Sequence, residues 1–264
     1  MEPKVIAMDL DGTLLGDDKE ISCYAQRVLR QCKARGMRLV LATARPLQDS
    51  KRYAEQVAAD GLIFHNGAYT WAEGALQEPG YTIPIGDARR VLLELQRRHP
   101  GRRLLVQIGA WGYANYDPGV FWPGCAYIPT DFTDLPEQPA DKMLLEVGAE
   151  AQAMQEVQDL LPPDLYGQRC DGILCAVMHK GATKHRALER LVSRWGCSLQ
   201  DVLAFGDDVN DEGMLRSCGL GVAMGNAQDC VKAAAGDRAG SNEQDGVAHY
   251  LQERLGLQVE SGTI

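Results

Sequence analysis

Two parts of the chain, one near each end, alternate short apolar runs with helical stretches, and this alternation constrains the fold most. In the first part the apolar runs cover residues 4–8, 37–43 and 61–67, and helical spacing covers 22–35 and 47–59. Short continuous apolar runs are typical of strands that are buried on both faces. Strands that alternate with helices in this way indicate a parallel sheet with helices on both faces.

The alternation returns after a segment with a different pattern of elements. Its apolar runs there cover residues 201–208 and 219–225, between further helical stretches. The intervening region itself combines strand-like runs, two helical stretches and a proline-rich segment, which is typical of an α+β domain with an antiparallel sheet. We therefore predict an α/β protein in which residues 1–81 and 180–264 form a Rossmann-like parallel-sheet core. Residues 82–179 are predicted to be a second domain inserted into that core.

The composition argues against several classes of function. The 264 residues carry a formal net charge of −9, which disfavours a general nucleic-acid binder, because such proteins neutralise phosphates with basic side chains. We see no apolar run long enough to span a bilayer and no signal peptide, so we expect no membrane partner. The eight cysteines form no C-x-x-C pair, so we expect free thiols in a cytoplasmic protein rather than a zinc site or disulfides.

Polar motifs follow four of the strands predicted for the core. In chain order they are DLDGT (9–13), ATAR (42–45), HNGA (65–68) and GDDVND (206–211). Two lysines, Lys180 and Lys184, stand at the start of the helix that opens the returning half. Because open parallel sheets place their sites at the carboxyl ends of their strands, we expect these motifs to lie together.

The residue types in these motifs suit the transfer of a phosphoryl group. Several carboxylates in one crevice are tolerable only around a hard cation held by oxygen ligands, and few-carboxylate sites suit Mg²⁺. The candidate carboxylates are those of Asp9, Asp11, Asp207, Asp208 and Asp211. Thr43, Lys184 and the backbone N–H groups of the Gly12 turn could hold phosphoryl oxygens. A carboxylate can attack phosphorus, and a second carboxyl group two positions on can protonate the leaving oxygen and then activate water.

Each motif taken alone has a plainer interpretation. D-x-D-G occurs in calcium loops, but an EF-hand loop needs its glycine at the sixth position, whereas Gly12 holds the fourth. Thr43 and Arg45 alone would be a helix N-cap and a surface charge. The pair Asn66-Gly67 alone indicates a turn, or a hairpin. The ordered combination of motifs carries the specificity.

In combination the motifs resemble those of the haloacid dehalogenase-like hydrolases, and specifically the Cof-type phosphatase subgroup. The similar segments span residues 5–15, 39–68 and 180–251, which cover the predicted core. They are DLDGTLL, ATAR, HNGA, GATKHRAL, FGDDVNDEGML, GVAMGNA and SNEQDGVA. The resemblance implies that the insert of residues 82–179 is a large α/β cap that closes over the site and selects the substrate.

The resemblance also implies roles for the residues that match the motifs. Asp9 matches the nucleophile and Asp11 the general acid/base. Thr43 matches the phosphate-binding hydroxyl group, and Lys184 matches the phosphate-binding lysine. Lys180 is then a charged residue at the edge of the site, near the hinge of the cap.

The implied metal site is Mg²⁺ held by Asp207, by Asp9 and by the backbone carbonyl of Asp11. Asp211 matches an acid that binds the metal or supports its water shell. The residues expected near the phosphate or the substrate are Gly12, Ala44, Arg45, Asn66 and Asn210. Two residues depart from the family pattern: Ala44 and His185 replace glycines, which indicates a local repacking or a narrower entrance to the phosphate site, and His185 could touch the substrate.

These observations predict a Mg²⁺-dependent phosphatase that hydrolyses small phosphorylated metabolites, sugar phosphates by family analogy, through an aspartyl-phosphate. One alternative is a sugar phosphomutase on the same fold, which would return the phosphoryl group to the sugar. Another is a non-catalytic regulatory protein that binds a phosphate ligand. The sequence leaves open the substrate and the choice between a monomer and a homodimer.

Overall fold

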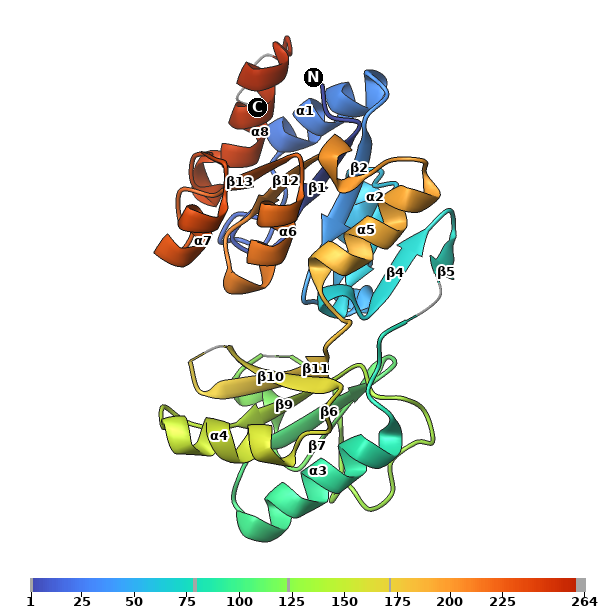
Figure 1. The fold of residues 1–264 in the computed structure, drawn as a ribbon, viewed down its shortest axis with the longest axis vertical. Helices are drawn as coiled ribbons and strands as arrows, with labels where there is room; N and C mark the ends of the chain where they lie inside the picture. The colour runs from blue at the N-terminus through green and yellow to red at the C-terminus, as the bar shows by residue number, and fades with distance from the viewer. Residues whose placement is uncertain (1, 78–79, 123, 171, 260–264) are drawn as a thin grey trace. The chain divides into compact units, whose positions relative to one another are not determined.

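The chain folds into two compact units (Figure 1). The computed structural model describes residues 2–77, 80–122, 124–170 and 172–259. Met1–Pro79 and Thr183–Ile264 form one unit, which we call the Rossmann-like unit. Gly80–Ala182 form the other, which we call the inserted unit.

The Rossmann-like unit is built on an eight-stranded sheet in the order β14-β13-β12-β1-β2-β3-β4-β5. Its strands are β1 (Val5–Met8), β2 (Arg38–Ala42), β3 (Gly61–Phe64), β4 (Tyr69–Ala72), β5 (Ala75–Gln77), β12 (Val202–Gly206), β13 (Leu220–Ala223) and β14 (Asp237–Arg238). The strands from β14 to β3 pair in parallel. The central strand β1 is buried along its whole length, as its continuous apolar run predicts.

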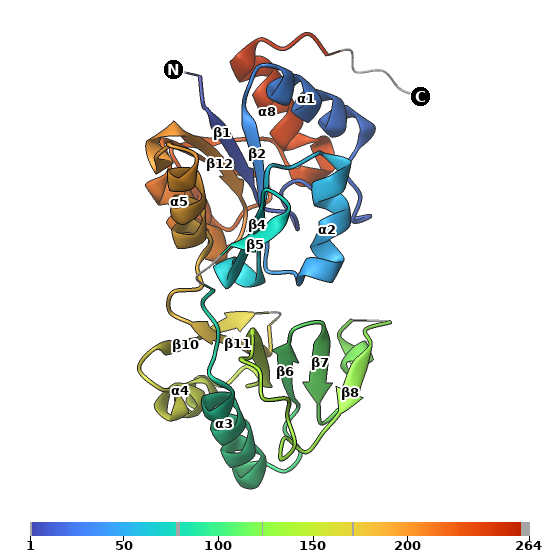
Figure 2. The ribbon, with the colours of Figure 1, turned by 90° about the vertical axis from the view of Figure 1, so that its right-hand side faces the viewer.

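Helices cover both faces of this sheet (Figure 2), so the predicted α/β fold class is confirmed. The helices are α1 (Cys23–Ala34), α2 (Leu47–Gln56), α5 (Lys184–Arg194), α6 (Glu212–Ser217), α7 (Asp229–Ala234) and α8 (Gly246–Leu255). Short 3₁₀ turns are η1 (His65–Gly67), η3 (Leu199–Asp201), η4 (Val209–Asp211) and η5 (Asn242–Gln244). Ser22 caps α1 by accepting a hydrogen bond from the backbone N–H of Ala25, which satisfies a donor that the helix itself leaves unpaired. Within the described residues, no helix is both long and apolar enough to cross a bilayer.

Two expected elements of this unit end earlier than their sequence patterns indicate. The strand expected over 61–67 stops at Phe64, because His65 and Asn66 have φ values of 48° and 56° in the left-handed region. The chain then turns back as β4, antiparallel to β3, so the hairpin interpretation of Asn66-Gly67 is correct. The helix expected to reach residue 59 ends at Gln56, close to the left-handed residue Ala58 (φ 49°).

The inserted unit has a six-stranded sheet in the order β10-β11-β9-β6-β7-β8. Its elements are α3 (Ile85–Arg98), β6 (Leu104–Ile108), β7 (Trp111–Ala114), η2 (Pro118–Val120), β8 (Tyr127–Pro129), β9 (Lys142–Glu146), α4 (Ala151–Leu160), β10 (Leu165–Cys170) and β11 (Leu174–His179). The expected antiparallel pairing is correct for β6, β7, β9, β10 and β11. It is wrong for β8, an edge strand parallel to β7 that lies in the proline-rich segment and ends at Pro129, where a missing N–H is tolerated.

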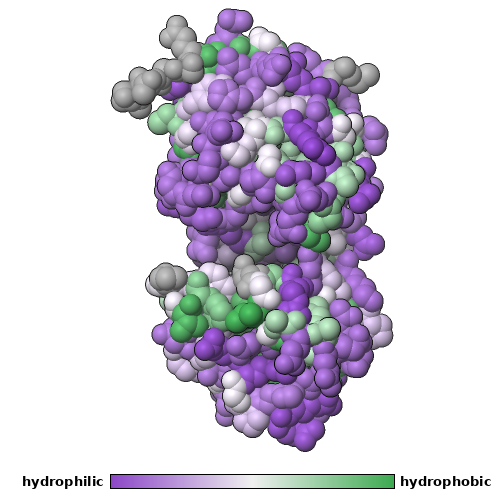
Figure 3. Space-filling view, turned by 90° about the vertical axis from the view of Figure 1, so that its left-hand side faces the viewer, coloured by the Kyte–Doolittle hydropathy of each residue, from purple (hydrophilic) through white to green (hydrophobic). Residues whose placement is uncertain are grey.

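Each unit has its own apolar core. In the inserted unit, α3 buries Ala88, Val91, Leu92 and Leu95, which follow helical spacing and pack with buried side chains of the sheet. This unit also exposes the large apolar side chains of Trp111, Val120 and Ile128, and Figure 3 shows apolar residues gathered on part of its surface.

Candidate active site

Asp9 directly follows β1, and its side chain is buried at the carboxyl edge of the sheet. Its backbone N–H donates to the carbonyl of Phe205 in the neighbouring strand β12 at 3.1 Å. Lys184, the first residue of α5, donates from Nζ to Oδ1 of Asp9 and to Oδ1 of Asp211, each at 2.7 Å. The Lys184 side chain is 0% exposed. A buried cation therefore links the first motif to the fourth.

Asp207 and Asp211 complete a cluster with Asp9. One carboxylate oxygen from each of the three lies within 4.8 Å of the others. Oδ2 of Asp211 accepts hydrogen bonds from the backbone N–H groups of Asp207 and Asp208, at 3.1 and 3.2 Å. The hydroxyl group of Thr13 donates to Oδ1 of Asp207 at 2.8 Å. We call the carboxylates of Asp9, Asp207 and Asp211 the acid cluster.

The electrostatics of the acid cluster show an excess of buried negative charge. Burial raises the pKa of Asp9 well above its ordinary value, and the neighbouring Asp211 adds to this effect while Lys184 opposes it. Burial, aided by Asp211, also raises the pKa of Asp207 to about 6. Burial disfavours the charged form of Lys184, yet Asp211 and Asp9 together raise its pKa above the ordinary value. One buried cation thus faces three carboxylates.

The acid cluster fits a hard divalent cation. Its donors are all carboxylate oxygens, which Mg²⁺ and Ca²⁺ prefer over nitrogen or sulfur. The turn at Gly12 (φ +76°) passes so close to this cluster that a Cβ there would lie 2.2 Å from Oδ2 of Asp207. Asn226 holds the turn by donating from Nδ2 to the carbonyl of Gly12 at 2.8 Å. Only glycine allows both the positive φ and this close approach.

The carboxylate of Asp11 is not part of the acid cluster. It accepts two hydrogen bonds from Arg45, at 2.6 and 2.7 Å, and one from Lys19 at 3.1 Å. Partial burial acts to raise the pKa of Asp11, but the hydrogen bonds and charges of Arg45 and Lys19 hold it below its ordinary value. Asp208 also lies apart: it is exposed and caps η4. Of the five carboxylates expected in one crevice, three form the acid cluster, whereas those of Asp11 and Asp208 have other partners.

The second and third motifs meet beside the fourth. Thr43 is buried after β2, and its hydroxyl oxygen accepts from the backbone N–H of Arg45 at 3.1 Å, while Ala44 between them is half-buried. The carbonyl of Thr43 accepts from the backbone N–H of Asn66 at 2.9 Å. Nδ2 of Asn210 donates to Oδ1 of Asn66 at 3.0 Å. These contacts bring the three motifs together at one edge of the sheet.

The two lysines expected near the phosphate lie in different environments. Lys180 is exposed and belongs to the inserted unit, whereas Lys184 is buried against Asp9. His185 packs against α6, because a Cβ on Gly213 would lie 2.6 Å from its Nδ1. Burial lowers the pKa of His185. This contact supports the interpretation of His185 as a local repacking between α5 and α6.

Four residues at or near the carboxyl edge of the sheet were not identified as candidates from the sequence. Thr13 belongs to the motif DLDGT and Asn226 to GVAMGNA, and their place in these motifs was a signal that could have identified them. Lys19 contacts Asp11, and Tyr53 contacts Lys19, but neither stands in a motif. No local pattern marks them, because the turn after Asp11 sets the first contact and the second joins residues 34 positions apart.

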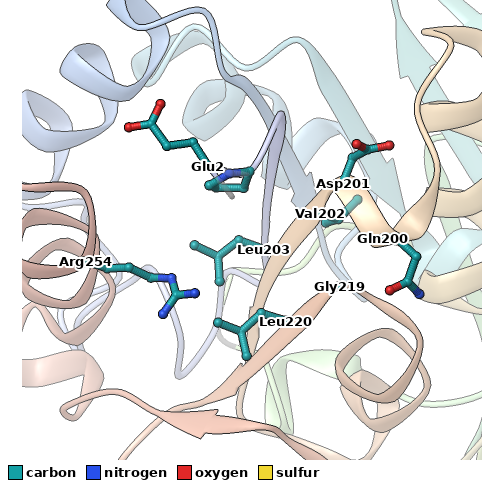
Figure 4. A pocket seen from close by; sticks show the side chains of 9 residues that line it. Glu2, Gln200, Asp201, Val202, Leu203, Gly219, Leu220 and Arg254 are labelled. Atoms are coloured by element: carbon teal, nitrogen blue, oxygen red, sulfur yellow. The ribbon is translucent and has the colours of Figure 1, made fainter.

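A cavity of about 230 Å³ opens elsewhere on the Rossmann-like unit (Figure 4). Its lining residues are Glu2, Pro3, Gln200, Asp201, Val202, Leu203, Gly219, Leu220 and Arg254. Val202 and Leu220 are the first residues of β12 and β13, so the cavity lies at the amino ends of these strands. The acid cluster lies at the opposite, carboxyl ends, where parallel sheets place their sites.

Comparisons with known proteins agree with this geometry. A family model described as haloacid dehalogenase-like hydrolase matches residues 6–251. A 5-amino-6-(5-phospho-D-ribitylamino)uracil phosphatase of Bacillus subtilis is 28% identical, with 97% of this chain and 99% of the relative covered. A pyridoxal phosphate phosphatase of Escherichia coli is 29% identical, with 97% and 100% covered. The crystal structure of a haloacid dehalogenase-like hydrolase from Bacteroides thetaiotaomicron superimposes with a TM-score of 0.82 at 28% identity, covering 96% of this chain and 100% of that one.

Proposed function

The chain belongs to the haloacid dehalogenase-like hydrolases, the family that its motifs predicted, and from this premise we propose that it is a Mg²⁺-dependent phosphatase of small phosphorylated metabolites. The observation that carries the proposal is Nζ of Lys184, fully buried and 2.7 Å from both Asp9 and Asp211. A carboxylate kept in a buried site beside a fixed cation is suited to attack a phosphate ester, because the cation offsets the repulsion between two anions.

In the proposed first step, a carboxylate oxygen of Asp9 attacks the phosphorus atom and forms an aspartyl-phosphate. The bond between phosphorus and the ester oxygen breaks, and Asp11, in its protonated form, gives its proton to the departing alcohol. Lys184, the hydroxyl group of Thr43 and the N–H groups of the Gly12 turn would hold the phosphoryl oxygens during the transfer.

In the second step, water attacks the phosphorus atom of the aspartyl-phosphate. Asp11, now a carboxylate, accepts a proton from that water, and the bond between phosphorus and the Asp9 oxygen breaks. Inorganic phosphate leaves, Asp9 is restored as a carboxylate, and Asp11 is ready to act as an acid again.

Asp9, Asp207 and the backbone carbonyl of Asp11 would hold the Mg²⁺ ion, with Asp211 binding it or supporting its water shell. When bound, the ion would neutralise the charge of the transferring phosphoryl group. The excess of negative charge in the acid cluster supports this assignment, since Lys184 alone does not balance three carboxylates.

We propose a class of substrate, small phosphate esters, and no single compound. Two relatives of nearly equal identity carry the names of phosphatases for different phosphate esters, so neither name is transferred to this chain. Asp9, Lys184, Thr43 and the Gly12 turn would contact the phosphoryl group, which all such esters share. We therefore propose that the inserted unit selects the rest of the substrate, and that sugar phosphates are the first compounds to screen.

A panel of phosphate esters with Mg²⁺ tests the proposal through the release of inorganic phosphate. We expect turnover of at least one sugar phosphate without a bisphosphate activator. A phosphomutase would need such an activator, so its absence from the assay separates the two activities. Asp9→Asn should abolish turnover, whereas Asp17→Asn, which alters an exposed acid nearby, should keep it. Turnover by Asp9→Asn within tenfold of the wild type would rule out Asp9 as the nucleophile.

A further inference from the structure

Two cations from separate segments hold the carboxylate of Asp11. Arg45 donates from Nε to Oδ2 at 2.6 Å and from Nη2 to Oδ1 at 2.7 Å. Lys19 donates from Nζ to Oδ1 at 3.1 Å. A bidentate arginine fixes both the distance and the plane of a carboxylate. Side chains, rather than its own turn alone, therefore set the orientation of Asp11.

Both Lys19 and Arg45 contact one buried side chain, that of Tyr53 in α2. The Tyr53 hydroxyl group donates to the backbone carbonyl of Lys19 at 2.8 Å, and the guanidinium of Arg45 lies 5.4 Å from the centre of the Tyr53 ring. Tyr53 has no exposed surface. Lys19 has a φ of 64°, a conformation that a non-glycine residue keeps only where its surroundings enforce it. A support of this kind places both cations in one arrangement.

We propose that Lys19, Arg45 and Tyr53 are positioning residues that hold Asp11 for proton transfer to and from the leaving group. The inference rests on the proposed function, in which Asp11 is the general acid/base. Three donors contact a carboxylate that offers roughly four lone-pair sites. One site is left for the proton that Asp11 passes to the ester oxygen, so the three contacts orient the group without blocking it.

The leaving group of the substrate reveals whether Asp11 is well placed. Phenolate is a more basic leaving group than p-nitrophenolate, so the departure of phenolate needs more proton transfer. The two esters present the same phosphoryl group to Asp9 and Lys184. A displaced Asp11 should therefore slow phenyl phosphate more than p-nitrophenyl phosphate, whereas a defect in phosphoryl binding should slow both equally.

The experiment measures kcat/KM of the Mg²⁺-loaded full chain on these two esters. For Lys19→Met we expect a loss of about tenfold on phenyl phosphate and of less than about twofold on p-nitrophenyl phosphate. The matched control is Lys51→Met: Lys51 lies in the same helix, α2, but it is exposed and pairs with Glu55. Lys51→Met should leave both rates unchanged.

Tyr53→Phe removes the hydroxyl group, which donates to the carbonyl of Lys19 and also accepts from Arg52. We expect a loss of about threefold on phenyl phosphate with the same dependence on leaving group. The double variant Lys19→Met/Tyr53→Phe should lose no more than Lys19→Met alone, because Tyr53 is proposed to act through Lys19. Melting temperatures of the variants check that each is folded.

The inference is overturned by an equal loss on both esters, by no loss in Lys19→Met, or by an equal effect of Lys51→Met. The proposed function is judged separately by Asp9→Asn. If the wild type hydrolyses both esters, Asp9→Asn hydrolyses neither, and Lys19→Met is unaffected, the function stands and the positioning role fails. A folded wild type that hydrolyses neither ester would overturn both.

Discussion

The two units of the chain differ in what they bury. The buried polar or charged side chains of the described residues are Asp9, Thr13, Thr43, Ser50, His65, Thr70, Asp141, Lys184 and Asp211. All but Asp141 belong to the Rossmann-like unit. Exposed large apolar side chains occur in both units: Trp111, Val120 and Ile128 in the inserted unit, and Leu76 and Val209 in the Rossmann-like unit. Because burying charge is costly, its concentration in one unit indicates where chemistry, rather than packing, determines the residues.

Lys184→Met is the strongest test of this contrast. It would leave Asp9 and Asp211 buried without their shared cation, and breaking a buried ion pair costs about 3–5 kcal/mol. We expect turnover of phosphate esters to fall by about a thousandfold or more, together with a lower melting temperature. Lys180→Met, which changes the exposed lysine of the same segment, should alter neither quantity. A thousandfold loss in Lys180→Met would move the chemistry toward the inserted unit.

Leu145→Ala tests whether the core of the inserted unit is independent. Leu145 in β9 is fully buried, and truncating such a leucine costs about 2–5 kcal/mol. Amide hydrogen exchange should speed up in β6 and β9 but stay unchanged in β1 and β12. Leu41→Ala in β2 should give the reverse pattern. Equal loss of protection in both units after either substitution would show that the cores are coupled.

Gly12→Ala tests how closely the first motif approaches the acid cluster. The new Cβ would lie 2.2 Å from Oδ2 of Asp207, so Asp207 or the turn must shift. We expect activity to fall by roughly thirtyfold, because small displacements of catalytic groups are costly. Gly36→Ala is the matched control: its φ is also positive, at +87°, but no atom lies within 4 Å of its Cβ. It should lose some stability and keep full activity, and a similar loss of activity in both variants would contradict the role of the close approach.

The pH dependence of stability gives the smallest expected effect. The pKa of Asp207 is about 6 in the folded chain, against about 3.9 in an unfolded one, so the folded state binds more protons between these values. Through this group, the stability of the metal-free protein should fall as pH rises from about 4 to about 6. Melting temperatures with a chelator should therefore fall a few degrees more for the wild type than for Asp207→Asn.

Adding Mg²⁺ at pH 7 should raise the melting temperature of the wild type more than that of Asp207→Asn, because the ion offsets the repulsion in the acid cluster. Parallel pH profiles of the two proteins would contradict the burial of charge at Asp207. An equal response to Mg²⁺ would place the ion elsewhere.

The sequence predicted most of the sheet because its evidence is local. The apolar run at Val5–Met8 and the capped helix after Ser22 have the periodicity and signals that strands and helices require. β8 escaped prediction because three residues in a proline-rich segment carry no period, and its pairing with β7 is made only in the folded unit. The run of residues 61–67 concealed the end of β3 at Phe64, whereas the Asn66-Gly67 pair, which favours a left-handed turn, correctly indicated the hairpin.

For the site, the sequence by itself determined which motifs could meet: carboxylates and a lysine after parallel strands converge at one edge of the sheet. Only the tertiary structure decided their partners. It turned the side chain of Asp11 toward Arg45 and Lys19, and it placed Asp9, Asp207 and Asp211 around Lys184. The physical reason is that the positions of strands along the chain follow from local patterns, whereas the orientation of a charged side chain depends on charges brought close by folding, here across 175 residues between Asp9 and Lys184.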